Sequence, residues 1–218
     1  MPGTPTTLSA LRSLLAARFP EKSRQPGGGV PTGVRAVDDA LGGGLPGGRL
    51  TEVVSAKPSS GGQTLLTQLL VNSRAAQRRV ALVDAADGFA PETVPADALR
   101  HLVWVRCQSV AQALAAADVL VRDGNFSVVI LDARGCDERE LRRTPATGWY
   151  RLQRATEIST VAVLVQTTCP LVPAVPARLV LHTPQALGCR RLARDTLATQ
   201  LVVEITRGHA DTAEERAG

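Results

Sequence analysis

Apolar residues in this chain occur in short continuous runs, separated by segments in which they recur at helical spacing. Runs that are apolar at nearly every position are typical of strands buried on both faces of a sheet. Such runs predict strands at 50–54, 80–84, 102–105, 126–132 and 161–166. Helical spacing predicts helices that follow residue 64 and cover 109–122 and 150–158. Strands alternating with helices indicate an α/β fold, a doubly wound and mainly parallel sheet flanked by helices. Three further runs predict strands that close the sheet, with antiparallel pairing expected, at 179–182, 190–194 and 201–206.

The first residues carry a separate amphipathic pattern. Residues 8–19 predict a helix with one apolar face, made by Leu8, Leu11, Leu14, Leu15 and Phe19. Pro20 ends this helix, and the polar, glycine-rich residues 21–29 predict a flexible tether. We therefore expect an N-terminal helix and tether at 1–29, a core at 30–209 and a polar tail at 210–218. The apolar face could bury against its own domain or against a neighbour, and the pattern leaves both open.

A glycine- and serine-rich turn, SAKPSSGGQT at 55–64, joins the first predicted strand to the next helix. This strand–turn–helix order is the context in which N–H groups at a helix start bind phosphate. Its candidate binding residues are Ser59, Ser60, Gly61, Gly62, Gln63 and Thr64. A working phosphate-binding loop has lysine directly after its last glycine. Here Gly62 and Gln63 follow Gly61, so we expect no cation to grip a terminal phosphate, and we expect Lys57 to be an exposed loop lysine.

Composition narrows the classes of function. The chain has 218 residues, 44% of them hydrophobic, and no apolar run reaches the roughly 20 residues of a membrane span. Its +5 charge, almost entirely from arginine, permits nucleic acid as a partner without requiring it. One tyrosine, two tryptophans and three phenylalanines supply a poor stacking platform for bases. Four scattered cysteines and three isolated histidines predict no metal site, and free thiols in a reducing cytoplasm.

Four segments, taken in order, carry a family resemblance. They are PTGVRAVDDALGGGLPGGRLTEVVS at 31–55, VALVDAADGFAPE at 80–92, SVVILD at 127–132 and VAVLVQ at 161–166. The set resembles the RecA/RadA core over residues 30–209 and implies a RecA-like fold. The resemblance places Asp132 at the Walker B position and Gln166 where the family senses nucleotide. With the loop residues 59–64 they would form a vestigial nucleotide site.

The same resemblance exposes departures from an active enzyme. The family's catalytic glutamate position is Ala86 here, and Asp87 next to it is one carbon shorter and displaced by one residue. With the loop lysine also missing, we expect no catalytic residue, no useful hydrolysis and no required cofactor. Weak binding of ATP and magnesium is left open, since Thr64 could still face a magnesium ion and Asp132 could equally be an inert relic.

Two loops differ from those with which recombinases contact DNA. Residues 133–154 carry six arginines, Arg134, Arg139, Arg142, Arg143, Arg151 and Arg154. These could contact phosphates, form a solvated helix face or meet an acidic protein surface. Residues 167–177 hold three prolines, which favour a fixed apolar surface over a mobile loop.

A RecA-like core with a degraded loop and a tethered helix is most similar to the ImuA family of SOS-mutagenesis accessory proteins. That resemblance implies a cytoplasmic adaptor in translesion synthesis that binds an ImuB-type polymerase homologue and RecA. The partner-binding candidates are Leu8, Leu11, Leu15, Phe19, Arg139, Arg142 and Arg143. Any direct binding to DNA is expected to be weak, and the oligomeric state is left open. Two alternatives stay open, a DNA-dependent ATPase or recombinase paralogue that would use Asp132, Gln166 and Arg207, and a SulA-like cell-division inhibitor.

Overall fold

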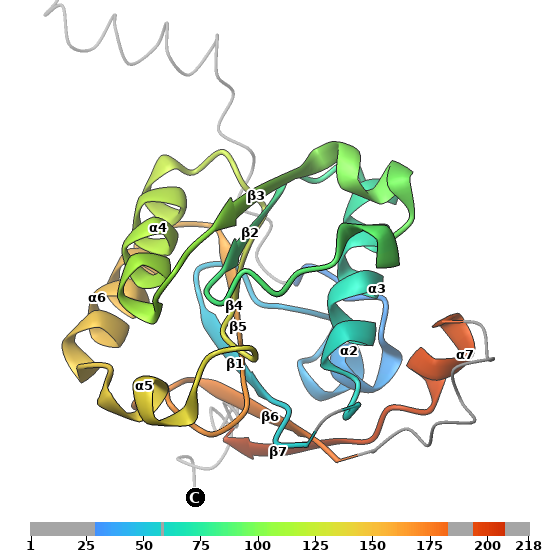
Figure 1. Cartoon of the computed structure of the whole chain (residues 1–218). Helices are drawn as coiled ribbons and strands as arrows, with labels where there is room; N and C mark the ends of the chain where they lie inside the picture. The colour runs from blue at the N-terminus through green and yellow to red at the C-terminus, as the bar shows by residue number, and fades with distance from the viewer. Residues whose placement is uncertain (1–28, 58, 183–193, 208–218) are drawn as a thin grey trace, which may run out of the picture.

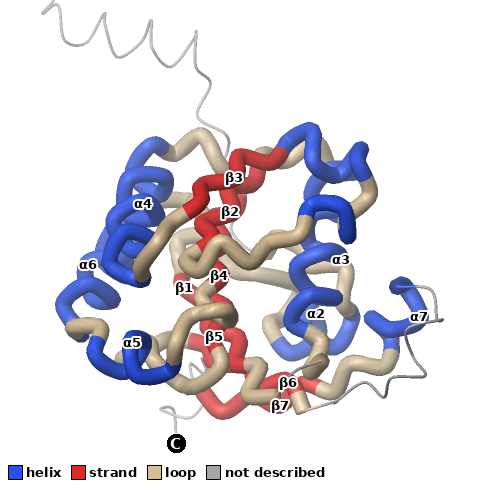
Figure 2. The backbone as a smooth tube through the Cα atoms, in the orientation of Figure 1, coloured by secondary structure: helices blue, strands red, loops and turns tan. Residues whose placement is uncertain are grey.

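The structure is a computed structural model, and it describes residues 29–57, 59–182 and 194–207. These residues form a seven-stranded sheet with helices on both of its faces (Figure 1). The backbone tube in Figure 2 shows α4, α5 and α6 on one side of the sheet and α2 and α3 on the other. The doubly wound α/β fold expected from the sequence is confirmed.

The strands lie in the order β3-β2-β4-β5-β1-β6-β7, and only the β6–β7 pair is antiparallel. Their bounds follow the predicted runs within about two residues: β1 (Leu50–Val54), β2 (Val80–Asp84), β3 (Leu102–Arg106), β4 (Val128–Asp132), β5 (Ala162–Thr167), β6 (Ala177–Leu181) and β7 (Val203–Arg207). The expected antiparallel pairing is found between β6 and β7, but on its other side β6 pairs with β1 in parallel, which was not expected. The chain leaving β5 passes β1 and enters the sheet in the same direction, so only β7 reverses.

The described helices are α2 (Arg35–Ala40), α3 (Gly62–Ala75), α4 (Val110–Asp123), α5 (Glu138–Arg143), α6 (Ala146–Glu157) and α7 (Arg194–Thr199), with 3-10 turns η1 (Pro91–Thr93) and η2 (Ala96–His101). Ser109 caps α4 by accepting a hydrogen bond from the N–H of Gln112 at 3.3 Å. Helix α6 begins four residues before the predicted start. Of the strand predicted at 190–194, the structure describes only Arg194, which is the first residue of helix α7. In this region Ala198 and Leu201 are buried, and their separation of three residues is a helical spacing.

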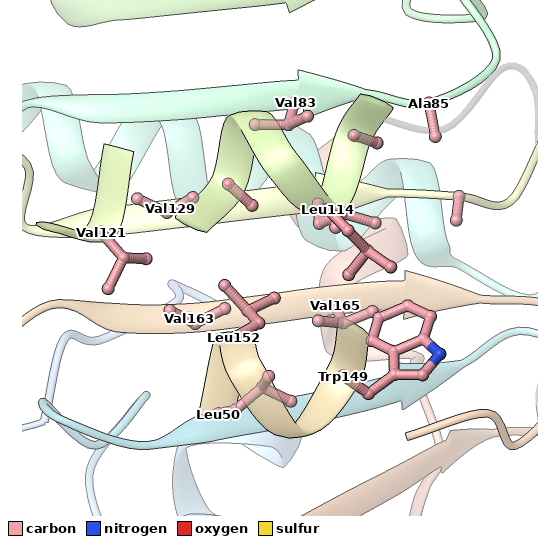
Figure 3. Packing of buried hydrophobic residues seen from close by; sticks show 14 of the residues in the cluster. Leu50, Val83, Ala85, Leu114, Val121, Val129, Trp149, Leu152, Val163 and Val165 are labelled. Carbon is pink, nitrogen blue, oxygen red and sulfur yellow. The ribbon is translucent and has the colours of Figure 1, made fainter. Parts of the chain in front are cut away.

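Two hydrophobic clusters hold the layers together, one on each face of the sheet. In the first, Trp149 and Leu152 of α6 pack with Leu114 of α4 against Val163 and Val165 of β5 (Figure 3). In the second, Leu65, Leu66, Leu69 and Leu70 of α3 pack against the opposite face of the same strands. Alternate residues of each strand point to opposite faces, which explains why continuously apolar strands are needed between two helical layers.

This alternation brings three polar side chains to one place. On β4 and β5 the residues that face α3 end in Asp132 and Gln166, because Ile130 and Leu164 precede them by two positions. Asp132 is in register with Gln166, and Gln166 with Val53 of the next strand, two residues before Ser55. Since β4, β5 and β1 are neighbours, their carboxyl ends form the floor of one site beside the glycine loop.

Candidate functional site

The glycine loop borders a cavity of about 450 Å³ at the carboxyl end of β1. All six predicted loop residues line it, namely Ser59, Ser60, Gly61, Gly62, Gln63 and Thr64. Gly61 caps α3 with φ +100°, and a Cβ at this position would lie 2.0 Å from Leu201 Cδ2. Glycine suits this position, because another residue would be strained by the positive φ and its Cβ would displace the Leu201 side chain.

One polar side chain of the loop is hydrogen-bonded within the loop itself. The hydroxyl of the buried Ser60 donates to the carbonyl of Lys57 at 2.6 Å. Ser59 lies in the left-handed region with φ +62°, a conformation in which non-glycine residues are uncommon. Lys57 is exposed, as predicted, yet it also lines the cavity. The loop therefore has the shape of a phosphate-binding loop and carries one peripheral cation.

A cation also reaches Gly62 from another strand end. Arg134, two residues beyond β4, donates to both carboxylate oxygens of Asp132, from Nε at 2.8 Å and from Nη2 at 2.6 Å. Its Nη2 also donates to Gln63 Oε1 at 3.2 Å. A side chain at position 62 would place its Cβ 2.6 Å from Arg134 Nη1. The sequence lacks the loop lysine, but the fold brings the guanidinium of Arg134 to the same place.

The sequence groups Arg134 with the arginines that could contact a partner, but the structure turns it inward. Residue type and charge alone do not separate it from the other five arginines of 133–154. The signal that could have found it is its place two residues after a carboxylate that ends a buried strand. From there an arginine can turn back along the strand end and meet the carboxylate with two parallel hydrogen bonds.

Two buried polar side chains at this site have no hydrogen-bond partner among the described residues. Ser55 Oγ is one, and a Cβ at position 62 would lie 2.8 Å from it. The amide of Gln166 is the other, with neither its oxygen nor its nitrogen paired and no exposed surface. Buried polar groups in folded proteins are nearly always paired, so both point to a site with a function.

Ala86 stands where the resemblance places the catalytic glutamate, and the nearby acids Asp84 and Asp87 do not face the cavity. The backbone N–H groups of Gly88 and Phe89 donate to Asp84 at 3.0 and 2.8 Å, which closes the turn after β2. Asp87 instead pairs with Arg106 on the exposed edge strand β3. The hydrogen bond from Arg106 lowers the pKa of Asp87 below its usual value. The lowered pKa makes Asp87 a weaker base, and its ion pair holds it on Arg106, so it does not replace the acid missing at Ala86.

The remaining predicted partner residues fall into two groups. Arg139, Arg142 and Arg143 lie on α5, and Arg142 pairs with Glu138 one turn earlier. Arg139 and Arg143 are exposed and have no ion pair within the described residues. Leu8, Leu11, Leu15 and Phe19 lie outside the described residues, as does the tail at 210–218, and the side chain of Arg207 is not described.

The proline-bearing segment between β5 and β6 is held against the body of the molecule. Val172 and Val175 are buried in the cluster under α6. The N–H groups of Leu171 and Val172 donate to the carboxylate of Glu52 at 2.7 and 3.1 Å. The segment is fixed, as expected, but its valines contribute to the core and do not form the apolar surface that the sequence suggested.

The described cysteines are free, in agreement with the prediction of unpaired thiols. Burial, with the nearby Glu140, Asp132 and Asp84 adding to it, raises the pKa of Cys136 to about 12. Burial also raises the pKa values of Cys107 and Cys169. These thiols are therefore protonated and weakly nucleophilic at neutral pH. In the part of the chain that the structure describes, no helix has the length and hydropathy to cross a bilayer.

A comparison with known families decides the relationship. The model of the RecA N-terminal domain matches residues 17–137, 121 of the 218 residues. The chain belongs to this family. The matched segment contains the loop, Asp132 and Arg134, and it ends before β5 and Gln166.

Individual relatives match over the same half of the chain. Protein RecA of Streptomyces ambofaciens is 37% identical over 121 residues, which are 53% of this chain and 32% of that protein. Protein RecA of Nocardia farcinica is 37% identical over 122 residues, covering 53% of this chain and 34% of its own. Protein RecA of Mycolicibacterium smegmatis is 36% identical over 122 residues, again 34% of its length. The RecA-like chain thus spans about a third of the length of these relatives.

Proposed function

We propose that this RecA-like chain is a non-hydrolysing adaptor that regulates SOS-induced DNA repair and translesion mutagenesis in the cytoplasm. It binds an ImuB-type polymerase homologue and RecA, as the resemblance to the ImuA family implies. The membership in the RecA family supports the link to DNA repair. The observation that carries the non-hydrolysing part is the pairing of Arg134 with Asp132.

The residues at the loop do not fit a magnesium–triphosphate complex. A magnesium ion in such sites needs the strand-end carboxylate as an oxygen ligand or as support for its waters. Both oxygens of Asp132 already accept hydrogen bonds from Arg134. Gly62 contributes no charge to the phosphates, and Ala86 offers no group to orient an attacking water. Each of the three parts that hydrolysis requires is therefore changed in this chain.

Partner binding is proposed to use surfaces away from the cavity. The exposed Arg139 and Arg143 on α5 suit an acidic protein surface. In RecA-like assemblies the N-terminal helix of one subunit packs on the core of the next. The apolar face of residues 8–19 would use the same contact to dock on a RecA subunit.

A phosphate-release assay tests the enzymatic half of the proposal. We expect the purified chain, with ATP and magnesium and with or without single-stranded DNA, to release no more phosphate than Asp132→Asn. Turnover that disappears in Asp132→Asn would instead establish a DNA-dependent ATPase. The unpaired amide of Gln166 is the observation that keeps this second function under test, because the family senses nucleotide from that position.

Binding assays with purified partners test the adaptor half. We expect the full chain to retain an ImuB-type homologue and RecA on an affinity column. Deletion of residues 1–26 should abolish retention of RecA, and Arg139→Glu with Arg143→Glu should weaken retention of the polymerase homologue. Arg79→Gln, an exposed arginine at the amino end of β2, is the control. Unchanged binding of RecA by the deletion variant would contradict the docking role of the helix.

A further inference from the structure

The guanidinium of Arg134 keeps one nitrogen free on the side of the glycine loop. Nε and Nη2 are bonded to Asp132, and Nη2 is also bonded to Gln63. Nη1 has no partner among the described residues, and it is the nitrogen that approaches Gly62. Arginine carries its N–H donors in a rigid planar fork. Fixing one edge of the fork on Asp132 therefore aims the N–H groups of Nη1 at the loop.

Ser55 adds a second donor to the same spot. Only 7% of the residue is exposed, and its hydroxyl has no partner in the described part of the chain. A Cβ at position 62 would lie 2.8 Å from Ser55 Oγ and 2.6 Å from Arg134 Nη1. Both donors thus pack against Gly62, and all three residues line the cavity in which a ligand would lie.

The N-terminus of α3 completes the set. The first backbone bond of this helix joins the Leu65 N–H to the Gly61 carbonyl at 2.9 Å. The N–H groups of Gln63 and Thr64 come before it and have no carbonyl partner within the helix. Together with the helix dipole they favour negative charge. Among the described residues that line the cavity, the charged ones are both cations, Lys57 and Arg134.

We propose that this cavity binds a metal-free diphosphate group, with Arg134 in place of both the loop lysine and the magnesium ion. Asp132 does not hold a metal; it holds Arg134 in position. Ser55 and the N-terminus of α3 supply neutral donors to the same oxygens. The donor set recognises the diphosphate alone, so free pyrophosphate and the tail of a nucleoside diphosphate are equivalent sources. This site does not depend on the adaptor role, and either proposal can fail without the other.

Calorimetric titration of the full chain with sodium pyrophosphate in EDTA tests the site. We expect binding without a divalent cation, and no tighter binding when magnesium replaces EDTA. Arg134→Gln should weaken binding about ten-fold or more, because it removes charge-assisted hydrogen bonds. Ser55→Ala should weaken it several-fold, and Arg79→Gln should leave it unchanged. Titration with ADP in EDTA separates the sources: binding tighter than that of pyrophosphate identifies a nucleotide, and weaker binding identifies the free anion.

Asp132→Asn discriminates between the two kinds of site. A magnesium-dependent site loses its ligand when this carboxylate is removed. The site proposed here keeps its cation, and the asparagine oxygen still accepts a hydrogen bond that positions Arg134, so Asp132→Asn should bind pyrophosphate in EDTA within about three-fold of the unchanged chain or more tightly. Thermal melts of each variant establish that it is folded. The proposal is overturned if the unchanged chain does not bind millimolar pyrophosphate, if binding needs magnesium, if folded Arg134→Gln binds equally well, or if folded Asp132→Asn loses binding.

Discussion

Glu52 and Asp132 are both buried carboxylates of this sheet, and each is bonded to one arginine, but their surroundings differ. Glu52 lies within β1 and faces the α6 side. Asp132 ends β4 and faces the α3 side, next to the glycine loop. Arg178, the partner of Glu52, is directly opposite it in the β1–β6 register. Arg134, the partner of Asp132, follows it by two residues on the same chain segment.

The Glu52 cluster leaves little polarity unsatisfied. Its carboxylate has no exposed surface and accepts hydrogen bonds from Leu171, Val172 and Arg178. Arg178 in turn donates to the carbonyl of Val172 at 2.7 Å. Each member thus fixes another, and the cluster attaches the segment after β5 to the centre of the sheet. Networks that are fully paired in this way stabilise one conformation.

In the Asp132 cluster, only some of the polar groups have hydrogen-bond partners among the described residues. Its arginine has a free edge toward a cavity, and the neighbouring Ser55 hydroxyl and Gln166 amide are unpaired among the described residues. Unpaired buried groups cost stability, about 1–3 kcal/mol each. The comparison indicates that the fold uses one carboxylate–arginine pair as structure and keeps the other for a ligand.

Glu52→Gln should have the largest effect on stability. It leaves the charge of Arg178 buried with no carboxylate and weakens the bonds to two backbone N–H groups. Breaking a buried ion pair on one side costs about 3–5 kcal/mol, and we expect a loss of that size in urea unfolding. The double variant Glu52→Met with Arg178→Met removes both charges and should recover most of the loss. A cost below about 1 kcal/mol for Glu52→Gln would contradict a structural role for this cluster.

Local sequence patterns predict the Asp132 cluster better than the Glu52 cluster, for a physical reason. The loop, Asp132 and Gln166 are found because strand ends and glycine turns are local signals. Glu52 stands in an apolar run, and its partner Arg178 is 126 residues away, so only the β1–β6 register joins them. Arg134 looks like a surface arginine until the fold brings Gly62 beside it.

The secondary structure shows the same limit. Strands buried on both faces are predicted to within about two residues, because burial requires continuous apolar runs. The sequence pattern misses the short helix α5, since it has six residues and a single buried one, Leu141. It also misses the parallel pairing of β6, because strand direction depends on how the chain crosses β1, which the composition of the strand does not encode.

Gly62→Lys should have the second-largest effect on stability, and it tests whether Arg134 fills the space beside residue 62. A side chain at position 62 overlaps Nη1, and overpacking of this kind costs about 1–3 kcal/mol. In an Arg134→Ala background the same lysine should be tolerated, with a coupling of about 1–2 kcal/mol in a double-mutant cycle followed by urea unfolding. Additive effects would show that the two side chains do not share this space.

Asp132→Asn provides the direct contrast with Glu52→Gln. The asparagine keeps one acceptor for Arg134, and the arginine can turn its charge toward the cavity. We therefore expect a loss of about 1 kcal/mol in the free energy of unfolding, well below that of Glu52→Gln. Equal losses for the two changes would remove the distinction between a structural pair and a ligand-binding pair.

A third carboxylate, Asp118 of α4, gives the smallest effect and tests the role of exposure. Its own burial would raise its pKa, but hydrogen bonds from Arg122 and Arg151 together lower the pKa below its usual value. Both arginines are at least half exposed, so Asp118→Asn should cost at most about 1 kcal/mol at pH 7. Because the folded-state pKa is lowered, this contribution is present above the ordinary pKa of about 3.9 and is lost as the pH falls through the lowered value. The free energies of unfolding in urea of the unchanged chain and of Asp118→Asn should therefore differ at pH 7 and converge near pH 2. A difference that persists at low pH would mean that the charge is not responsible and that the substituted amide perturbs packing between α4 and α6.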